Sequence, residues 1–331
     1  MSSTLRPKVV YIMGSGRSGT TLLGSILGEL PGVFNAGEVA YIWERGILEP
    51  RGCGCGADPI DCPVWSRVIR MTAGSGDPRA LAEEMMSRRR NLRLRNTWGL
   101  LGHSDPGAGN DRSKVSAATD YARVLAELYR HLFEVTGAHT IVDTSKYPAD
   151  AALIGRLGDI EPFFVHLVRD PRAVANSWRR RKEGIARRKL PLAAADWLIT
   201  NLAGDAVRRR HRARSVLIPY EALIQKPAAW IRAITTQAGL PDSDVPLFAD
   251  GMIELHANHT VSGNPDRFRI GPTRLTADEG WHAELPGWQA AVVVALTWPR
   301  LRHYGYPWMA AAAAAAIEHA ESQAASPTIV R

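Results

Sequence analysis

The segment from Gly14 to Leu23, GSGRSGTTLL, is the feature that most constrains the fold of this chain. It follows a short apolar stretch, Lys8 to Met13, which has the length of a buried strand, and it leads into a helix-compatible sequence. A glycine-rich turn between a strand and a helix directs backbone N–H groups and the positive end of the helix dipole toward one point. The segment therefore predicts a phosphate-binding loop.

The spacing of the glycines matches two known kinds of nucleotide loop. Gly14, Gly16 and Gly19 fit the dinucleotide pattern GxGxxG, and Glu38 stands about 20 residues farther on, where a ribose-binding acid is expected. Gly14 and Gly19 also have the spacing of the nucleotide-kinase loop GxxxxGK[ST], but Thr20 replaces its obligatory Lys. An ordinary strand–turn–helix connection is the structural alternative to both.

A third interpretation gives the loop a single 5′-phosphate to bind. Arg17 then supplies a permanent positive charge, and the hydroxyls of Thr20 and Thr21 add hydrogen-bond donors at the start of the helix. The residues expected to contact the ligand are Ser15, Gly16, Arg17, Ser18, Gly19, Thr20 and Thr21.

A second motif, PFFVHLVRDPRAVANSW, occupies residues 162–178. Its apolar run from Phe163 to Val168 is typical of an inner parallel strand, and Asp170 followed by a proline predicts the start of a helix. Arg169 therefore lies at the carboxyl end of a buried strand, where ligands bind in open α/β sheets, and Ser177 follows about two helical turns later. Together they are candidates to bind a second phosphate. The alternative is that Arg169 pairs with a carboxylate at the sheet edge.

In these two motifs the chain resembles sulfotransferases that use 3′-phosphoadenosine 5′-phosphosulfate (PAPS). The resemblance spans about residues 8–306 and is closer to the tyrosylprotein, carbohydrate-type and bacterial branches than to the cytosolic aryl sulfotransferases. It implies an α/β, P-loop-like, three-layer fold with a central parallel sheet and a helical insertion. Further similar segments are VDTSK (142–146), PYEALIQKP (219–227) and HTVSGNPDRFR (259–269).

The resemblance also implies roles for charged residues. The glutamate of the early GE pair, Glu38, is the expected general base for the acceptor hydroxyl, and His259 is the reserve candidate. Glu38 also precedes the periodic segment 39–48, so a helix-terminal carboxylate is its alternative role. Arg17 and Lys146 are expected to bring positive charge to the transferred group, since this chemistry needs in-line positioning and cations. A solvated loop lysine is the alternative for Lys146.

Two later segments supply further candidates for nucleotide binding. Residues 262–269 contain Gly, Asn and Pro, which predict a loop, and the resemblance makes Asn264 and Arg267 candidates for the 3′-phosphate. Tyr220 follows the predicted strand from Val216 to Ile218. It is a candidate for the nucleotide side of the site, with packing against a neighbouring helix as the equal alternative.

Three cysteines, Cys53, Cys55 and Cys62, cluster in RGCGCGADPIDCPVW. Three is an odd number, and in a cytosolic chain these cysteines are expected to stay reduced. A zinc site requires four ligands, and no histidine lies nearby in the sequence. The sequence therefore predicts a tight loop next to the active site and no metal.

Composition and length predict one α/β domain. The chain has 331 residues, of which 45% are hydrophobic and 22% charged, enough to bury a large core. Residues 44–137 read as a mainly helical insertion, and 307–331 as a helical C-terminal tail with a short Ala-rich run. The first residues lack the pattern of a secretory signal, so a cytoplasmic location and no membrane span are expected.

The net charge of +8 raises a nucleic-acid alternative. The basic runs lack interleaved aromatic residues, which favours solvated helix faces over a nucleic-acid surface; the run at residues 178–190 is a candidate basic lid. The sequence as a whole predicts transfer of a sulfuryl group from PAPS to a hydroxyl of a glycan or small natural product. A nucleotide-dependent phosphotransferase and a basic nucleic-acid or anion-binding module are the alternatives.

Overall fold

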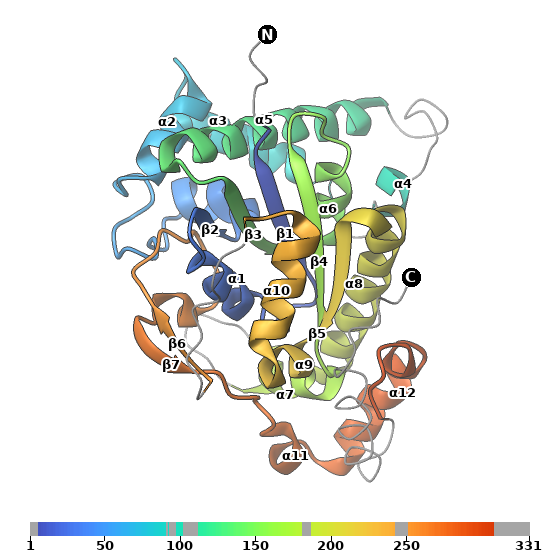
Figure 1. The fold of residues 1–331 in the computed structure, drawn as a ribbon. Coiled ribbons are helices and arrows are strands. Elements are labelled where there is room, and N and C mark those ends of the chain that lie inside the picture. Colours follow the sequence, from blue (N-terminus) through green and yellow to red (C-terminus); the bar gives the residue numbers. More distant parts are fainter. Residues whose placement is uncertain are drawn as a thin grey trace.

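A central sheet of five parallel strands organises the computed structural model, which describes residues 6–90, 92, 97–101, 112–180, 187–241 and 251–307. The strand order is β2-β3-β1-β4-β5 (Figure 1). This arrangement confirms the predicted α/β fold with a central parallel sheet. The strands are β1 (Lys8–Met13), β2 (Val33–Gly37), β3 (Thr140–Lys146), β4 (Glu161–Val168) and β5 (Ser215–Pro219).

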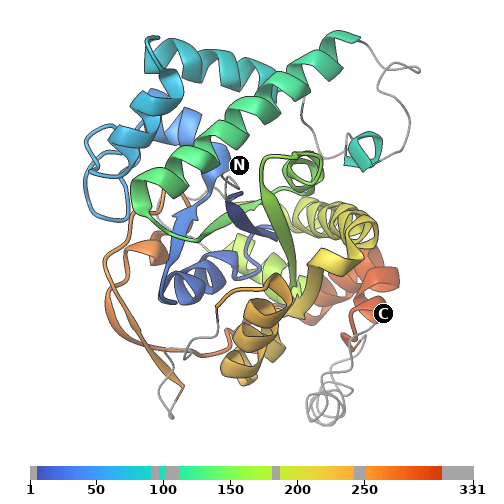
Figure 2. The same cartoon turned by 45° about the horizontal axis from the view of Figure 1, so that its top comes forward.

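The sheet is covered on both faces because successive side chains of its central strand point to opposite sides. On one face, Val10 and Ile12 pack with the apolar side chains of α1, α9 and α10. On the other, Tyr11 and Met13 pack with those of α2, α3, α5 and α6. Figures 1 and 2 show these two helical layers. Their bounds are α1 (Thr20–Gly28), α9 (Tyr220–Gln225), α10 (Pro227–Ala238), α2 (Trp65–Ala73), α3 (Pro78–Arg89), α5 (Arg112–Thr136) and α6 (Pro148–Ile154).

A third group of helices packs beside β4 and β5. Val168, Val174 and Trp197 form a small apolar cluster there with Tyr304. The α7 helix begins as the sequence predicts, because the Asp170 side chain accepts a hydrogen bond from the backbone N–H of Arg172. The helices are α7 (Pro171–Arg179), α8 (Leu190–Arg210), α11 (Trp281–Glu284) and α12 (Gly287–His303), with the short η4 (Arg212–Arg214) before β5.

The region predicted as an insertion contains α2, α3, α5 and the short α4 (Thr97–Leu101). The periodic segment 39–48 forms a 3₁₀ turn, η1 (Val39–Tyr41), followed by a π-helix, η2 (Ile42–Leu48). The division into a core and an insertion stays a prediction. The tail after residue 307 and residues 181–186 of the predicted lid lie outside the described residues.

The segment after α10 crosses back toward β2. It forms a small antiparallel sheet of β6 (Met252–Leu255) and β7 (Gly271–Arg274), with the 3₁₀ turn η5 (Pro265–Phe268) between them. Val261 forms single bridges to Gly37 and to Cys53, so the predicted loop 262–269 lies beside the end of β2. Among the described residues, no helix is both long and apolar enough to cross a membrane.

The turn after β1 depends on glycine at its first position. Gly14 has a φ of 155°, and its N–H donates to the carbonyl of Lys146 at 3.2 Å. A Cβ atom at residue 14 would lie 2.3 Å from the carbonyl oxygen of Leu167. The loop therefore passes between the ends of β3 and β4 at a separation that only glycine permits.

Replacing Gly14 by Ala should destabilise the fold, because the new methyl group collides with backbone that cannot move independently of the sheet. The expected loss is about 1–3 kcal/mol, the usual cost of overpacking, and the thermal midpoint should fall by several degrees. Differential scanning calorimetry measures this. Gly158→Ala is the matched control, because a Cβ there meets no atom within 4 Å. Equal midpoints for both variants would contradict the steric argument.

Candidate active site

The residues singled out from the sequence converge on one cleft at the carboxyl ends of the parallel strands. The cleft has a volume of about 930 Å³. The predicted residues that line it are Gly16, Arg17, Gly19, Thr20, Thr21, Glu38, Lys146, Arg169, Ser177, Tyr220, Asn264 and Arg267. The common location was expected for strand-end residues, since ligands bind at this edge of parallel sheets.

The loop from β1 to α1 presents backbone to the cleft. The N–H of Leu23 donates to the carbonyl of Gly19, which is the first hydrogen bond of α1. The N–H groups of the four residues before Leu23 therefore have no partner within the helix. Two of the predicted loop residues, Ser15 and Ser18, do not line the cleft. Their hydroxyls are buried and hydrogen-bonded to each other at 2.8 Å. The two serines bond to each other within the loop, and the N–H groups at the start of α1 remain as hydrogen-bond donors for a ligand.

Arg17 connects the two sequence motifs. Its backbone has a φ of 72°, which is uncommon for a residue with a side chain. Its Nε donates to Ser177 Oγ at 2.9 Å, and its carbonyl accepts from Arg169 at 3.2 Å. Burial, together with the positive charge of Arg169, lowers the pKa of Arg17. The loop and the second motif thus form one positively charged surface, which favours a bound anion.

Arg169 faces the cleft from the end of β4. Its guanidinium lies 4.6 Å from the centre of the Tyr220 ring and 3.3 Å from a carboxylate oxygen of Asp278. Among the described residues, its Nε is buried and has no hydrogen-bond partner. Asp278 also pairs with Arg180 at 3.0 Å. Burial opposes ionisation of Asp278, but these two arginines outweigh it and lower the pKa of the carboxyl group.

Glu38 and Lys146 form an ion pair at the opposite side of the loop. Glu38 directly follows β2 and is 4% exposed. Lys146 ends β3 with a φ of 75°. Burial of the ammonium group, and then the charge of Arg17, lower the pKa of Lys146 to about 8. Ser262 donates to the second carboxylate oxygen of Glu38 at 3.4 Å, so this carboxylate is held from two directions.

A buried carboxyl group behind this pair fixes the end of β3. Asp143 accepts hydrogen bonds from the backbone N–H of Ser145 at 2.7 Å and from the hydroxyl of Tyr129 at 2.5 Å. The Ser145 hydroxyl also donates to Asp143, and it accepts from the N–H of Ala40 at 2.9 Å. This network joins the residue before Lys146 to the turn that follows Glu38. It therefore sets the relative position of the two charged groups.

Three other predicted residues have mainly structural contacts. The Tyr220 ring packs against the backbone of Gly19, because a Cβ atom at residue 19 would lie only 2.5 Å from a ring carbon. Arg267 is 4% exposed and donates to the carbonyls of Thr260, Arg51 and Gly52 at 2.7–3.0 Å. Asn264 donates to the Asp266 carboxylate. Through these hydrogen bonds Arg267, which lies after Val261 in the chain, holds its own segment against the loop before Cys53.

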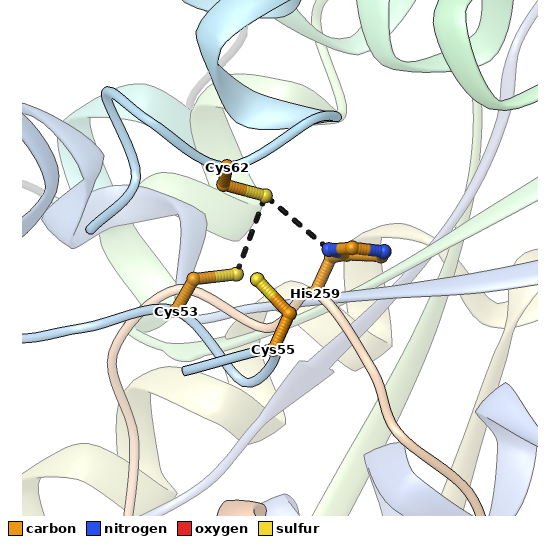
Figure 3. Close-up of side chains that lie close together, drawn as sticks. All are labelled: Cys53, Cys55, Cys62 and His259. Carbon is orange, nitrogen blue, oxygen red and sulfur yellow. Dashed lines mark hydrogen bonds between the residues drawn. The ribbon is translucent and has the colours of Figure 1, made fainter. Parts of the chain in front are cut away.

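The cysteines and the reserve base His259 lie together outside this cleft. His259 does not line it among the described residues, and its Nδ1 lies 3.2 Å from the thiol of Cys62. Figure 3 shows the ring turned toward Cys53, Cys55 and Cys62. The sequence offered no histidine near the cysteines, but the fold brings one from about 200 positions later in the chain.

The sequence reasoning missed several residues that line the cleft. Tyr41, Arg45 and Tyr147 flank the Glu38 side, and the Arg45 guanidinium lies 3.8 Å from the centre of the Tyr41 ring. Trp178 and Asp278 lie on the Arg169 side. Tyr147 and Trp178 directly follow predicted site residues, which was the available signal. Asp278 stands in no motif, and nothing local indicated it.

A model of the Sulfotransferase family matches residues 7–244, which include the loop, Glu38, Lys146, Arg169 and Ser177. The chain belongs to this family. No curated protein sequence gives a significant match. The family membership predicted from the two sequence motifs is therefore confirmed.

Several solved structures are similar to this sulfotransferase. The sulfotransferase domain from the curacin biosynthetic pathway is 15% identical, with 91% of this chain and 98% of that chain covered and a TM-score of 0.49. The sulfotransferase domain from the Synechococcus PCC 7002 olefin synthase is 19% identical, with 97% and 96% covered and a TM-score of 0.40. A sulfotransferase from Alicyclobacillus acidocaldarius is 14% identical, with 88% and 96% covered and a TM-score of 0.36.

The buried carboxyl of Asp143 should give the stability of this sulfotransferase a characteristic pH dependence. Burial raises its pKa from 3.8 to about 6, against the hydrogen bonds that it accepts. The folded chain therefore holds this proton more tightly than the unfolded chain. The contribution is fully present below about pH 4 and is lost as the pH rises through about 6, with a size of ~3 kcal/mol.

Asp143→Asn should remove that pH dependence. From about pH 4 to pH 7, the stability of the variant should improve relative to the unsubstituted chain by up to ~3 kcal/mol, whatever its absolute loss from altered hydrogen bonds. Urea unfolding at each pH measures the difference. Asp58→Asn, at an exposed position, is the control and should keep a constant difference. A constant difference for Asp143→Asn as well would show that this carboxyl titrates normally.

Proposed function

We propose that this sulfotransferase moves a sulfuryl group from PAPS to a hydroxyl of a glycan or small natural product. Family membership supports sulfuryl transfer. The donor, the acceptor class and the residue roles are the proposal. The observation that carries it is the contact between Arg17 and Ser177, which joins the phosphate loop and the second motif in one cleft.

Two groups of hydrogen-bond donors in the cleft support a doubly phosphorylated nucleotide as the ligand. The first-turn N–H groups of α1, with Thr20 and Thr21, offer one anion site at a helix N-terminus. Arg169 offers a second, because its buried Nε lacks a partner among the described residues and its other contacts include the exchangeable Asp278 carboxylate. A Cβ at Gly16 would lie 2.8 Å from Trp178, so the loop and the ring pack closely at this wall.

In the proposed mechanism the charged residues have different roles. PAPS supplies a sulfuryl group already attached to a phosphate leaving group. Arg17 and Lys146 stabilise the negative charge that builds on the oxygen of the breaking bond. Glu38 accepts the proton of the acceptor hydroxyl as the new sulfur–oxygen bond forms. Ser262 orients the carboxylate, and the Asp143 network fixes its distance from Lys146.

The ion pair between Glu38 and Lys146 bears on both roles. The proposed roles require a protonated Lys146, which brings positive charge to the donor, and an ionised Glu38, which can accept a proton. Two aromatic residues that line the cleft, Tyr41 and Tyr147, have ring centres 6.1 Å apart and form part of the wall beside this pair.

Binding of the donor product can be measured without knowing the acceptor. Adenosine 3′,5′-bisphosphate should raise the thermal midpoint of the chain, whereas ATP, ADP and NAD at the same concentration should not. Arg17→Ala should reduce this shift strongly, because it removes a partly buried cation and the Ser177 contact. Arg232→Ala, an exposed arginine on α10, is the control. A magnesium-dependent shift with ATP alone would instead support a phosphotransferase.

Glu38→Gln should abolish turnover and leave the affinity for the nucleotide unchanged. Loss of a general base typically costs about 10²–10⁴-fold in kcat. The assay uses radiolabelled PAPS with the acceptor that the unsubstituted chain sulfates best in a panel of glycans and phenols. Glu49→Gln, which removes a carboxylate that is 68% exposed, is the control. Turnover by Glu38→Gln within about tenfold of the unsubstituted rate would move the base elsewhere.

A further inference from the structure

Four potential metal ligands from two distant segments meet beside the end of β2. The ligand atoms of Cys53, Cys55, Cys62 and His259 all lie within 4.8 Å of one another (Figure 3). Cys53 and Cys62 are buried, and all three thiols are free. The proposed mechanism, with Glu38 as the base, uses none of these four groups.

We propose that these four side chains bind one structural zinc ion. In a tetrahedral site with Zn–S near 2.3 Å and Zn–N near 2.0 Å, neighbouring sulfurs lie about 3.8 Å apart, and sulfur and nitrogen about 3.5 Å. The thiols of Cys53 and Cys62 are 3.6 Å apart, and the Cys62 thiol is 3.2 Å from His259 Nδ1. These separations need only a few tenths of an ångström of adjustment.

The donor set favours zinc and a closed site. Three thiolates and one imidazole are ligands that select Zn²⁺ over Mg²⁺ or Ca²⁺, which prefer oxygen. Four protein ligands leave no open position, as in structural sites. Three thiolates with Zn²⁺ leave one net negative charge, and the buried Arg267 guanidinium lies close by, bound to the carbonyls of Arg51 and Gly52.

The backbone around the cluster already holds the ligands in place. The N–H of Gly54 donates to the carbonyl of Thr260 at 3.0 Å, and the indole N–H of Trp65 donates to the carbonyl of His259 at 2.5 Å. Cys53 bridges Val261, which in turn accepts from the N–H of Glu38 at 2.8 Å. A metal ion would therefore fix the segment that carries Ser262 against the residue proposed as base.

The metal content of the full chain tests this inference without any activity measurement, so its outcome is separate from that of the proposed function. After purification from zinc-supplemented cells and exchange into metal-free buffer, elemental analysis should find about one zinc ion per chain. His259→Ala should lose most of it. His256→Ala is the matched control, since this exposed histidine three residues earlier pairs with Glu29 and should keep the zinc.

Two further measurements keep the test decisive if His259→Ala folds poorly. Cobalt exchanged into the unsubstituted chain should give thiolate-to-metal absorption in the near ultraviolet, and His259→Cys, which restores four ligands, should bind zinc again. Removing the metal from the unsubstituted chain should also speed hydrogen exchange in residues 256–269. Less than about a tenth of an equivalent of zinc, another metal in its place, a disulfide between Cys53 and Cys62, or equal zinc in His259→Ala would overturn the proposal.

Discussion

The parallel pairing of β1 with both β3 and β4 is the constraint on which the site depends. Met13 is in register with Lys146 on one side and with His166 on the other. The three strands therefore end close together, and the chain leaves each of them on the same side. Arg17, Lys146 and Arg169 meet for this reason, although they stand in three separate parts of the sequence. The glycine at the end of β1 lets the backbone turn in the narrow space that remains.

Features set by local chemistry were predictable. The apolar run of β4, the Asp170 cap and the following proline specify a strand–turn–helix unit whatever the rest of the chain does. The glycine-rich loop does the same for β1 and α1. Once two such units are known to be parallel neighbours, their ends must share an edge of the sheet. The shared edge brings Arg17 and Arg169 together, whereas their assignment to a single nucleotide rests on the family resemblance.

Features set by long-range contacts were not predictable. Whether the hydroxyls of Ser15 and Ser18 face the cleft or each other depends on packing that the pattern of the loop does not encode. Asp278 approaches Arg169 from beyond β7, and no motif marks it. His259 reaches the cysteines only because the returning segment pairs with Gly37, and a single bridge of that kind leaves no trace in the sequence. In each case the partner is fixed by the path of the chain and not by its neighbours in sequence.

The carboxylate of Asp278 between Arg169 and Arg180 acts as a built-in counterion. It makes the gathering of like charges tolerable while the cleft holds only solvent. An anion that binds Arg169 either shares the guanidinium with this carboxylate, through the Nε that has no partner among the described residues, or displaces the carboxylate. A phosphate monoester, with nearly two negative charges, competes better against the single charge of a carboxylate than a monoanion does. For an anion that displaces Asp278, this counterion favours a divalent over a singly charged competitor at this end of the cleft.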